Sequence, residues 1–202
     1  MRHGGDQGKA LGILERQTHH LIRLIDDLLD LSRLVRGKIH LVGESLDLRA
    51  VLGESVELVE PRMKAQRQHL TIEQPALPVR VNGDRIRLRQ VIANLLDNAA
   101  KYAPAASTIT VKLVAEDDLA RLTVTDEGPG IDPANLESIF EPFVQVPDPR
   151  TQSTEGLGLG LPLARQLLEL HGGTIVVRNV SVAGGCEVEI KLPLAGGPAT
   201  LS

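Results

Sequence analysis

Four polar side chains recur at helical spacing near the middle of the chain. Gln90, Asn94, Asn98 and Lys101 follow one another at intervals of four, four and three residues, which places them on one face of a helix predicted from about Asp84 to Tyr102. An amide oxygen suits Mg²⁺ that is shared with phosphate oxygens, and a lysine supplies a mobile positive charge for those phosphates. Taken alone, the stripe is better explained as a solvated helix face. The other faces carry apolar residues, namely Val91, Ile92, Leu95, Leu96 and Ala99.

A carboxylate ends the hairpin that is predicted to follow this helix. The strands Thr108–Val114 and Leu119–Asp126 flank a polar turn, Ala115–Asp118, and Asp126 continues the inward apolar face of the second strand. The segment Gly128-Pro129-Gly130-Ile131 then allows close backbone approach, which leaves a pocket whose acceptor could receive an exocyclic amine such as that of adenine. For an isolated Asp-x-Gly-x-Gly, an aspartate that caps a turn is the simpler interpretation.

A run of alternating glycines and leucines, Gly156 to Leu161, leads into an apolar helix predicted from about Gly160 to Leu170. Backbone N–H groups and the helix dipole at such a position favour an anion, although the glycines could equally be packing devices. The run lacks the lysine of a nucleotide P-loop and does not follow a strand. The segment before it, from Glu141, is long and proline-containing, so a mobile lid is predicted over Gln145 to Glu155.

The elements around these segments indicate an α+β fold with a mixed, largely antiparallel sheet and helices on one face. The domain boundary is expected near Gly43, with 1–42 as a helical segment, 43–195 as the main domain and 196–202 as a tail. The remaining predicted elements are a bundle helix from Leu11 to about Gly37, a link Lys38 to Val42, a helix Leu48 to Gln66 capped by Ser45 or Asp47 and weakened by Pro61, strands Leu70–Glu73, Val79–Val81, Thr174–Val180 and Glu187–Leu192, and a short helix near Pro133–Phe140.

Composition excludes several classes of protein. The 202 residues carry a formal net charge of −4, and the aromatics are limited to Tyr102, Phe140 and Phe143, so nucleic acid is not an expected partner. No apolar run exceeds three residues, which predicts a cytoplasmic chain that makes no membrane contact itself. A single cysteine, Cys186, excludes an internal disulfide, and without paired cysteines or His-Glu-x-x-His any metal would be bound by oxygen.

The order and mutual spacing of these segments resemble the ATP-binding half of the sensor histidine kinases, of the GHKL superfamily. The resemblance covers roughly Leu11 to Leu194, and the C-terminal His171-Gly172-Gly173 and Leu192-Pro193 also fit the family. It implies a two-layer α/β sandwich of the Bergerat type, preceded by a long bundle helix. The matching motifs are the N-box Gln90-x3-Asn94-Leu95-Leu96-x-Asn98-Ala99-x-Lys101-Tyr102, the first glycine box Asp126-Glu127-Gly128-Pro129-Gly130-Ile131, the F-box Ile139-Phe140-Glu141-Pro142-Phe143, and the second glycine box Gly156 to Leu161.

The resemblance implies ATP and Mg²⁺ as cofactors and assigns a role to each motif. Asn98 would coordinate Mg²⁺, and Asn94, the expected catalytic residue, would lie at the phosphates with Lys101 and Tyr102. Asp126 would bind the adenine amine in a pocket shaped by Gly128, Gly130 and Ile131. The second glycine box would bind nucleotide through Gly156, Leu157, Gly158, Leu159, Gly160 and Leu161, with Gly158 and Gly160 letting the lid close.

The segment Arg23 to Ser32 resembles the second helix of the family's dimerisation and phosphotransfer domain. That resemblance implies a homodimer or a helix-bundle partner through residues 11–36, and a response regulator receiver domain as a further partner. Met1 to Asp6 resembles the loop of a helical hairpin, so we expect an upstream helix to be missing from this chain. The full-length protein could then be tethered to a membrane.

Two departures from the family pattern bear on function. Cys186 stands where the family has Thr or Ser, so either a water-mediated contact near adenine is lost or a small apolar side chain fills the core. None of the six histidines is followed by the Glu of the phosphoacceptor box His-Glu-x-x-x-Pro, and His19 and His20 are better explained as helix-surface or seam residues than as alternative acceptors.

The chain is therefore predicted to be the ATP-binding catalytic part of a two-component histidine kinase, which transfers the γ-phosphate to a histidine outside this chain. A binding function is the alternative, as an ATP-dependent interaction module or degenerate kinase that docks a partner through its bundle helix. An anti-sigma type of serine kinase is a third possibility, and the bundle helix argues against it.

Overall fold

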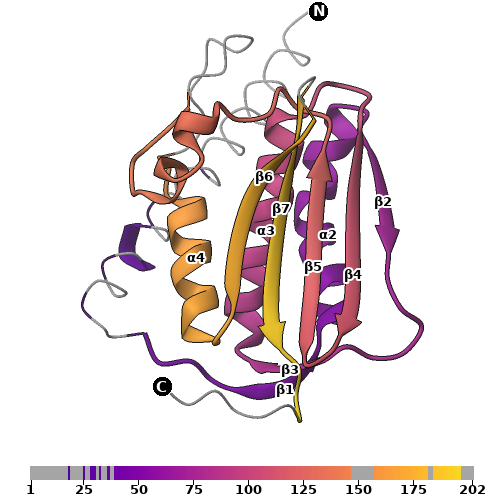
Figure 1. Ribbon diagram of the computed structural model, residues 1–202, viewed down its shortest axis with the longest axis vertical. Coiled ribbons are helices and arrows are strands. Elements are labelled where there is room, and N and C mark those ends of the chain that lie inside the picture. The colour runs from indigo at the N-terminus through magenta and orange to yellow at the C-terminus, as the bar shows by residue number, and fades with distance from the viewer. Residues whose placement is uncertain are drawn as a thin grey trace, which may run out of the picture.

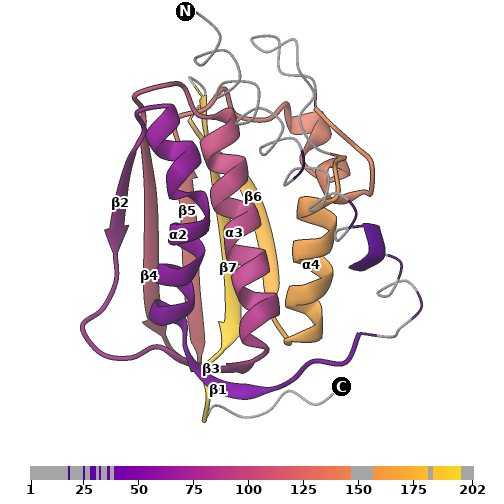
Figure 2. The same ribbon diagram turned by 180° about the vertical axis from the view of Figure 1, so that it is seen from behind.

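The computed structural model describes residues 18, 25, 28–30, 32, 36, 39–146, 157–181 and 184–196. Its main feature is a five-stranded sheet with the order β2-β4-β5-β7-β6. In the described part of the chain, three α-helices lie against this sheet. They cover one of its faces, and Figures 1 and 2, seen from opposite sides, show no helix on the other face. This confirms the predicted α+β architecture of two layers.

The sheet is largely antiparallel, as the sequence predicted. Its strands are β2 (His69–Glu73), β4 (Thr108–Glu116), β5 (Leu119–Asp126), β6 (Thr174–Ser181) and β7 (Gly184–Pro193). Only the pairing of β2 with β4 is parallel among the described strands. The β4–β5 hairpin closes through Asp117 and Asp118, where Asp117 takes a positive φ of 52°. Asp tolerates the left-handed region because its short side chain can hydrogen-bond locally.

The helices are α2 (Leu48–Ala65), α3 (Arg85–Tyr102) and α4 (Gly160–Leu170). Asp47 caps α2 through a bond from Arg49 N to Oδ1 (3.1 Å), and Asp84 caps α3 by accepting from Ile86 N and Arg87 N. Pro61 lies inside α2, which continues to Ala65 in agreement with the predicted helix Leu48 to Gln66. Both Pro61 and Glu57, whose carbonyl loses its intrahelical donor, are exposed, so water can replace the missing bond.

Two elements differ from the sequence prediction. The expected link is followed by a short strand, β1 (Glu44–Asp47), which pairs antiparallel with β3 (Arg80–Gly83) in a separate two-stranded sheet. The helix predicted near Pro133–Phe140 is instead two single 3-10 turns, η1 (Pro133–Asn135) and η2 (Ser138–Phe140). Each 3-10 turn spans only three residues, which is too short for the hydrogen bonds between residues four apart that define an α-helix.

The hydrophobic core lies between the sheet and the helices. Inward positions of β5 alternate strictly, with Ala120, Leu122, Val124 and Asp126 all buried. The apolar sides of α3 and α4 pack onto this surface. Most of the predicted helix Leu11 to Gly37 lies outside the described residues, although Thr18, Ile25, 28–30 and Ser32 are helical.

A candidate nucleotide site at one end of the sheet

Three segments far apart in the sequence meet at one end of the domain. The end of α3, the end of β5 and the start of α4 all lie at the upper end of the molecule in Figure 1. The contact between α3 and the loop after β5 is close, because a Cβ atom on Gly128 would lie 3.1 Å from the carbonyl oxygen of Tyr102. The N-box and both glycine boxes therefore lie at the same end of the domain.

Asp126 is buried at the end of β5, as the inward alternation predicted. Its Oδ1 accepts a hydrogen bond from Gly128 N at 2.7 Å. A Cβ atom on Gly128 would lie 2.6 Å from the same oxygen, so only glycine allows the loop to turn so tightly around the carboxylate. The aspartate therefore caps this turn, and its carboxylate is buried at the end of the sheet where the sequence predicted a site.

The polar stripe of α3 faces the start of α4. The side-chain nitrogen of Asn94 is buried and has no hydrogen-bond partner among the described residues. A Cβ atom on Gly160, the first residue of α4, would lie 3.8 Å from that nitrogen. Leu159 caps α4 without a side-chain hydrogen bond. A buried amide donor and the N-terminus of an uncapped helix thus lie together, which is an arrangement that suits an anion.

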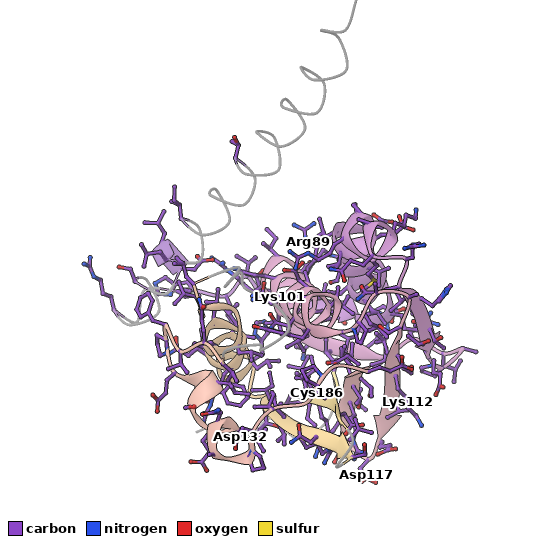
Figure 3. All side chains as sticks on the ribbon, turned by 90° about the horizontal axis from the view of Figure 1, so that it is seen from above. Arg89, Lys101, Lys112, Asp117, Asp132 and Cys186 are labelled. Atoms are coloured by element: carbon purple, nitrogen blue, oxygen red, sulfur yellow. The ribbon has the colours of Figure 1, made fainter. Side chains whose placement is uncertain are left out.

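Lys101 and Tyr102 end the stripe where α3 ends. Lys101 Nζ donates to the hydroxyl of Tyr102 at 3.0 Å and lies 4.6 Å from the centre of its ring. Viewed from above in Figure 3, Lys101 lies in the helix layer and Cys186 in the sheet layer beneath it. Asn98 is half-buried on the same face, one turn before Lys101. Amide, ammonium and phenol groups therefore line the helix side of the site.

Gln90, the first member of the predicted stripe, has different partners. Its side chain donates to Asp30 Oδ2 at 3.1 Å and accepts from Arg87 at 2.9 Å. Arg87 also forms an ion pair with Asp30, with Nη1 and Oδ2 2.5 Å apart. The start of the stripe thus contacts the N-terminal segment, and no motif in the sequence identifies Asp30 and Arg87 as partners. No local pattern could reveal this contact, because the two sides are 57 residues apart.

The F-box and the second glycine box are joined at the base of the predicted lid. Phe143 N donates to Gly158 O at 3.1 Å, and a Cβ atom on Gly158 would lie 2.5 Å from Val144 O. Gly158 also has a positive φ of 70°, so both space and backbone conformation require glycine here. Leu159 is buried, Leu157 is exposed, and Leu161 packs partly against the core. Gly156 and residues 147–155 of the predicted lid lie outside the described residues.

Cys186 lies next to Asp126 on the neighbouring strand, where the two residues are paired across β5 and β7. Burial raises the pKa of its thiol to about 12, and the negative charges of Asp126 and Glu187 act in the same direction. The side chain is therefore a neutral thiol near pH 7. Of the two interpretations of this residue, the small buried side chain agrees with the structure.

The donor set of the site fits a nucleotide held with a hard cation. Asn94, Lys101 and the start of α4 supply donors and positive charge, Asp126 supplies a buried acceptor, and Asn98 supplies an amide oxygen. Within the described part of the chain, no group of three or more His, Cys, Asp or Glu residues could hold a metal ion by itself. A two-layer α/β sandwich that carries these groups at one end of its sheet is typical of the class of ATP-binding domains that the sequence motifs predicted.

The chain belongs to the family of histidine kinase-, DNA gyrase B- and HSP90-like ATPases, whose sequence model matches residues 83–196. It is 37% identical over 179 residues to the non-motile and phage-resistance protein of Caulobacter vibrioides, covering 87% of this chain and 21% of that protein. It is 38% identical over 172 residues to the adaptive-response sensory kinase SasA of Thermosynechococcus vestitus, covering 84% of this chain and 44% of that protein. The chain thus spans less than half the length of either relative.

Solved structures agree with this family. The structure of full-length ShkA in complex with AMPPNP matches 94% of this chain and 39% of its own, with a TM-score of 0.77 and 30% identity. The mycobacterial sensor histidine kinase MprB matches 76% of this chain and 98% of its own, with a TM-score of 0.67 and 32% identity. The sequence and fold are those of the ATP-binding catalytic part of a two-component kinase.

Proposed function

We propose that this chain binds Mg·ATP at the end of the sheet and supplies the catalytic half of a protein-histidine kinase. One observation carries the proposal: the buried carboxylate of Asp126, the unpartnered amide nitrogen of Asn94 and the uncapped start of α4 lie around the same end of the domain. A carboxylate acceptor suits the amine of adenine, and the two donor groups suit phosphates.

The residues divide between the two ends of the nucleotide. Asp126 would accept the adenine amine, in a pocket formed by the backbone of Gly128, Gly130 and Ile131. Asn94, Lys101 and Tyr102 would hold the phosphates, and the segment 156–161 would close on them. Asn98 would bind Mg²⁺, which neutralises charge on the transferring phosphate. Catalysis would then consist mainly of positioning and charge stabilisation.

The reaction would join the γ-phosphorus to an imidazole nitrogen, break its bond to the bridging oxygen and release ADP. The acceptor would be a histidine on a separate helix, because no histidine of this chain is followed by the Glu that orients it in the family. This chain would therefore not phosphorylate itself. Residues 11–36 would form a homodimer or a helix bundle, and a response regulator receiver domain would take the phosphate onward.

The proposed division of the chain follows the same logic. The partial phosphotransfer helix would occupy 1–42, the catalytic domain 43–195 and a short tail 196–202. Ile25, Leu28 and Leu29 are each about half exposed, which is consistent with an apolar helix face that awaits a partner. In the described part of the chain, no helix is long and apolar enough to cross a membrane.

Asp126→Asn tests the proposal most directly. The amide presents a donor to the adenine amine where the carboxylate presents an acceptor, so a buried polar group loses its partner. That loss should weaken ATP binding roughly 5- to 150-fold in calorimetry. Asp132→Asn is the matched control, because Asp132 is an exposed cap of η1 in a nearby loop, where its Oδ1 accepts from Ala134 N. Unchanged ATP affinity in a folded Asp126→Asn protein would refute the assignment.

A further inference from the structure

Asn179, a residue of β6 outside every recognised motif, contacts the first glycine box with both ends of its side-chain amide. Its Oδ1 accepts from Ile131 N at 2.8 Å, and its Nδ2 donates to Ile131 O at 2.7 Å. The two bonds fix both peptide groups that flank the Ile131 Cα. Asn179 and Ile131 are 48 residues apart, so this contact exists only in the folded domain.

The side chain belongs to a row of three residues that crosses the sheet. Asn179 on β6 pairs with Cys186 on β7, and Cys186 pairs with Asp126 on β5. Residues directly opposite each other in antiparallel strands point to the same face, so all three point toward the helix layer. Figure 3 shows the central member, Cys186, in the sheet below the helices. The glycine box spans this row from Asp126 to Asn179.

The loop between these two ends has little room to move. Gly130 has a positive φ of 75°, and a Cβ atom there would lie 2.8 Å from Asn179 Oδ1. Gly185 N donates to Gly128 O at 2.7 Å, and a Cβ atom on Gly184 would lie 2.7 Å from the same oxygen. Gly128 is bonded in turn to Asp126. The loop is therefore held at three places, of which Asn179 is the one farthest from Asp126.

We infer that Asn179 is a positioning residue for the base-binding half of the site. It holds Ile131 at a fixed place in the loop that follows Asp126, so that the pocket for the purine is formed before nucleotide binds. This inference rests on the proposed function, because it concerns the pocket that Asp126 defines. A preformed pocket avoids the cost of ordering a loop on binding.

The inference predicts different effects on binding of the base and on binding of the phosphates. Asn179→Ala removes both bonds to Ile131 and should raise the Kd for Mg·ATP about tenfold. The Ki of Mg-tripolyphosphate, which has no base, should not change in competition with a fluorescent ATP analogue. Asn179→Asp keeps an acceptor for Ile131 N but places a carboxylate oxygen against Ile131 O, so it should weaken ATP at least as much.

Asn82→Ala provides the matched control, because Asn82 is an exposed asparagine on β3 outside the five-stranded sheet. Thermal unfolding of each variant establishes that it is folded. ATP affinity equal to wild type in both Asn179 variants would overturn the inference, as would an equal loss for ATP and tripolyphosphate, which indicates a general structural role. If wild type itself fails to bind ATP, both the proposed function and the inference are refuted. If Asp126→Asn weakens ATP binding and the Asn179 variants do not, only the inference is refuted.

Discussion

His171 is half-buried where the end of α4 meets the start of α3, and its two ring nitrogens have opposite hydrogen-bonding roles. Nδ1 lies 2.6 Å from Leu167 O, and Nε2 accepts from Asp84 N at 2.9 Å. The ring is therefore neutral with its proton on Nδ1. Burial lowers the pKa of His171, although the bond to Leu167 and the charge of Asp84 act in the opposite direction. Asp84 meanwhile caps α3 and accepts from Val42 N, so one histidine supports a junction of three segments.

This lowered pKa predicts how the stability of the domain depends on pH. As pH falls through about 6.5, the unfolded chain gains a proton on this histidine that the folded chain does not. The free energy of unfolding should therefore be fully present above that pH, decrease below it and level off near the lower pKa of the folded state. His171→Gln can still accept from Asp84 N but cannot titrate, so its stability should depend less on pH between about pH 7 and about pH 5.

Urea unfolding at a series of pH values measures this difference. His69→Gln is the control, because His69 is an exposed histidine on β2. A pH dependence in His171→Gln as steep as that of wild type would contradict the role assigned to the His171 ring.

Strand β7 carries a buried glutamate on the outer face of the sheet, where no helix covers it. Glu189 lies within salt-bridge distance of Arg178 (3.2 Å), Arg121 (3.4 Å) and Lys191 (3.2 Å). These cations come from β6, β5 and β7, so a single carboxylate ties three adjacent strands together. The glutamate side chain is only 8% exposed, whereas Arg178 is 52% exposed, so screening by solvent weakens part of the network.

Glu189→Gln should lower the free energy of unfolding by about 1–3 kcal/mol, because it leaves three neighbouring cations without their shared partner. Glu116→Gln removes an exposed carboxylate with Arg121 as its partner and should cost less than about 1 kcal/mol. Chemical denaturation at low and high salt checks both values, and the difference between the variants should shrink at high salt. Equal stability of Glu189→Gln and wild type would show that the network contributes nothing.

The whole chain joins a catalytic domain to an N-terminal helical segment through a polar contact. Asp30 is buried against Arg87 and Gln90, while Ile25 and Leu28 in the same segment remain about half exposed. The described contact thus uses charged and polar side chains, and these two apolar side chains stay partly exposed. This arrangement is consistent with the proposal that the segment binds a partner helix.

The whole chain is predicted to transfer phosphate to a histidine that lies on another polypeptide. Mixed with Mg·ATP and a separately made helix hairpin that carries an intact acceptor box, it should label the hairpin and remain unlabelled itself. In-line geometry supplies up to about 7–11 kcal/mol of the barrier in such transfers, and His19 and His20 lack the adjacent Glu that would orient them. The label is followed by its stability in alkali and its loss in acid. Such a label on this chain, removed by His20→Gln, would contradict the prediction.

Local patterns in the sequence determined most of the elements and predicted the residues of the candidate site. Helical periodicity predicted α3 and α4 closely, because both helices carry an apolar face, and Pro104 marks the end of α3. Alternation predicted the β4–β5 hairpin and the inward carboxylate of Asp126. These features depend on neighbours within a few residues, so one sequence suffices to find them.

Only the tertiary structure decided the contacts that join distant segments. Strand β1 exists because β3 lies beside it, and the bonds from Asn179 to Ile131 and from Asp30 to Arg87 each span about 50 residues or more. The parallel pairing of β2 with β4 has the same origin. Such partners are selected by the packing of the whole domain, since a hydrogen bond or an ion pair between distant residues leaves no period in the sequence.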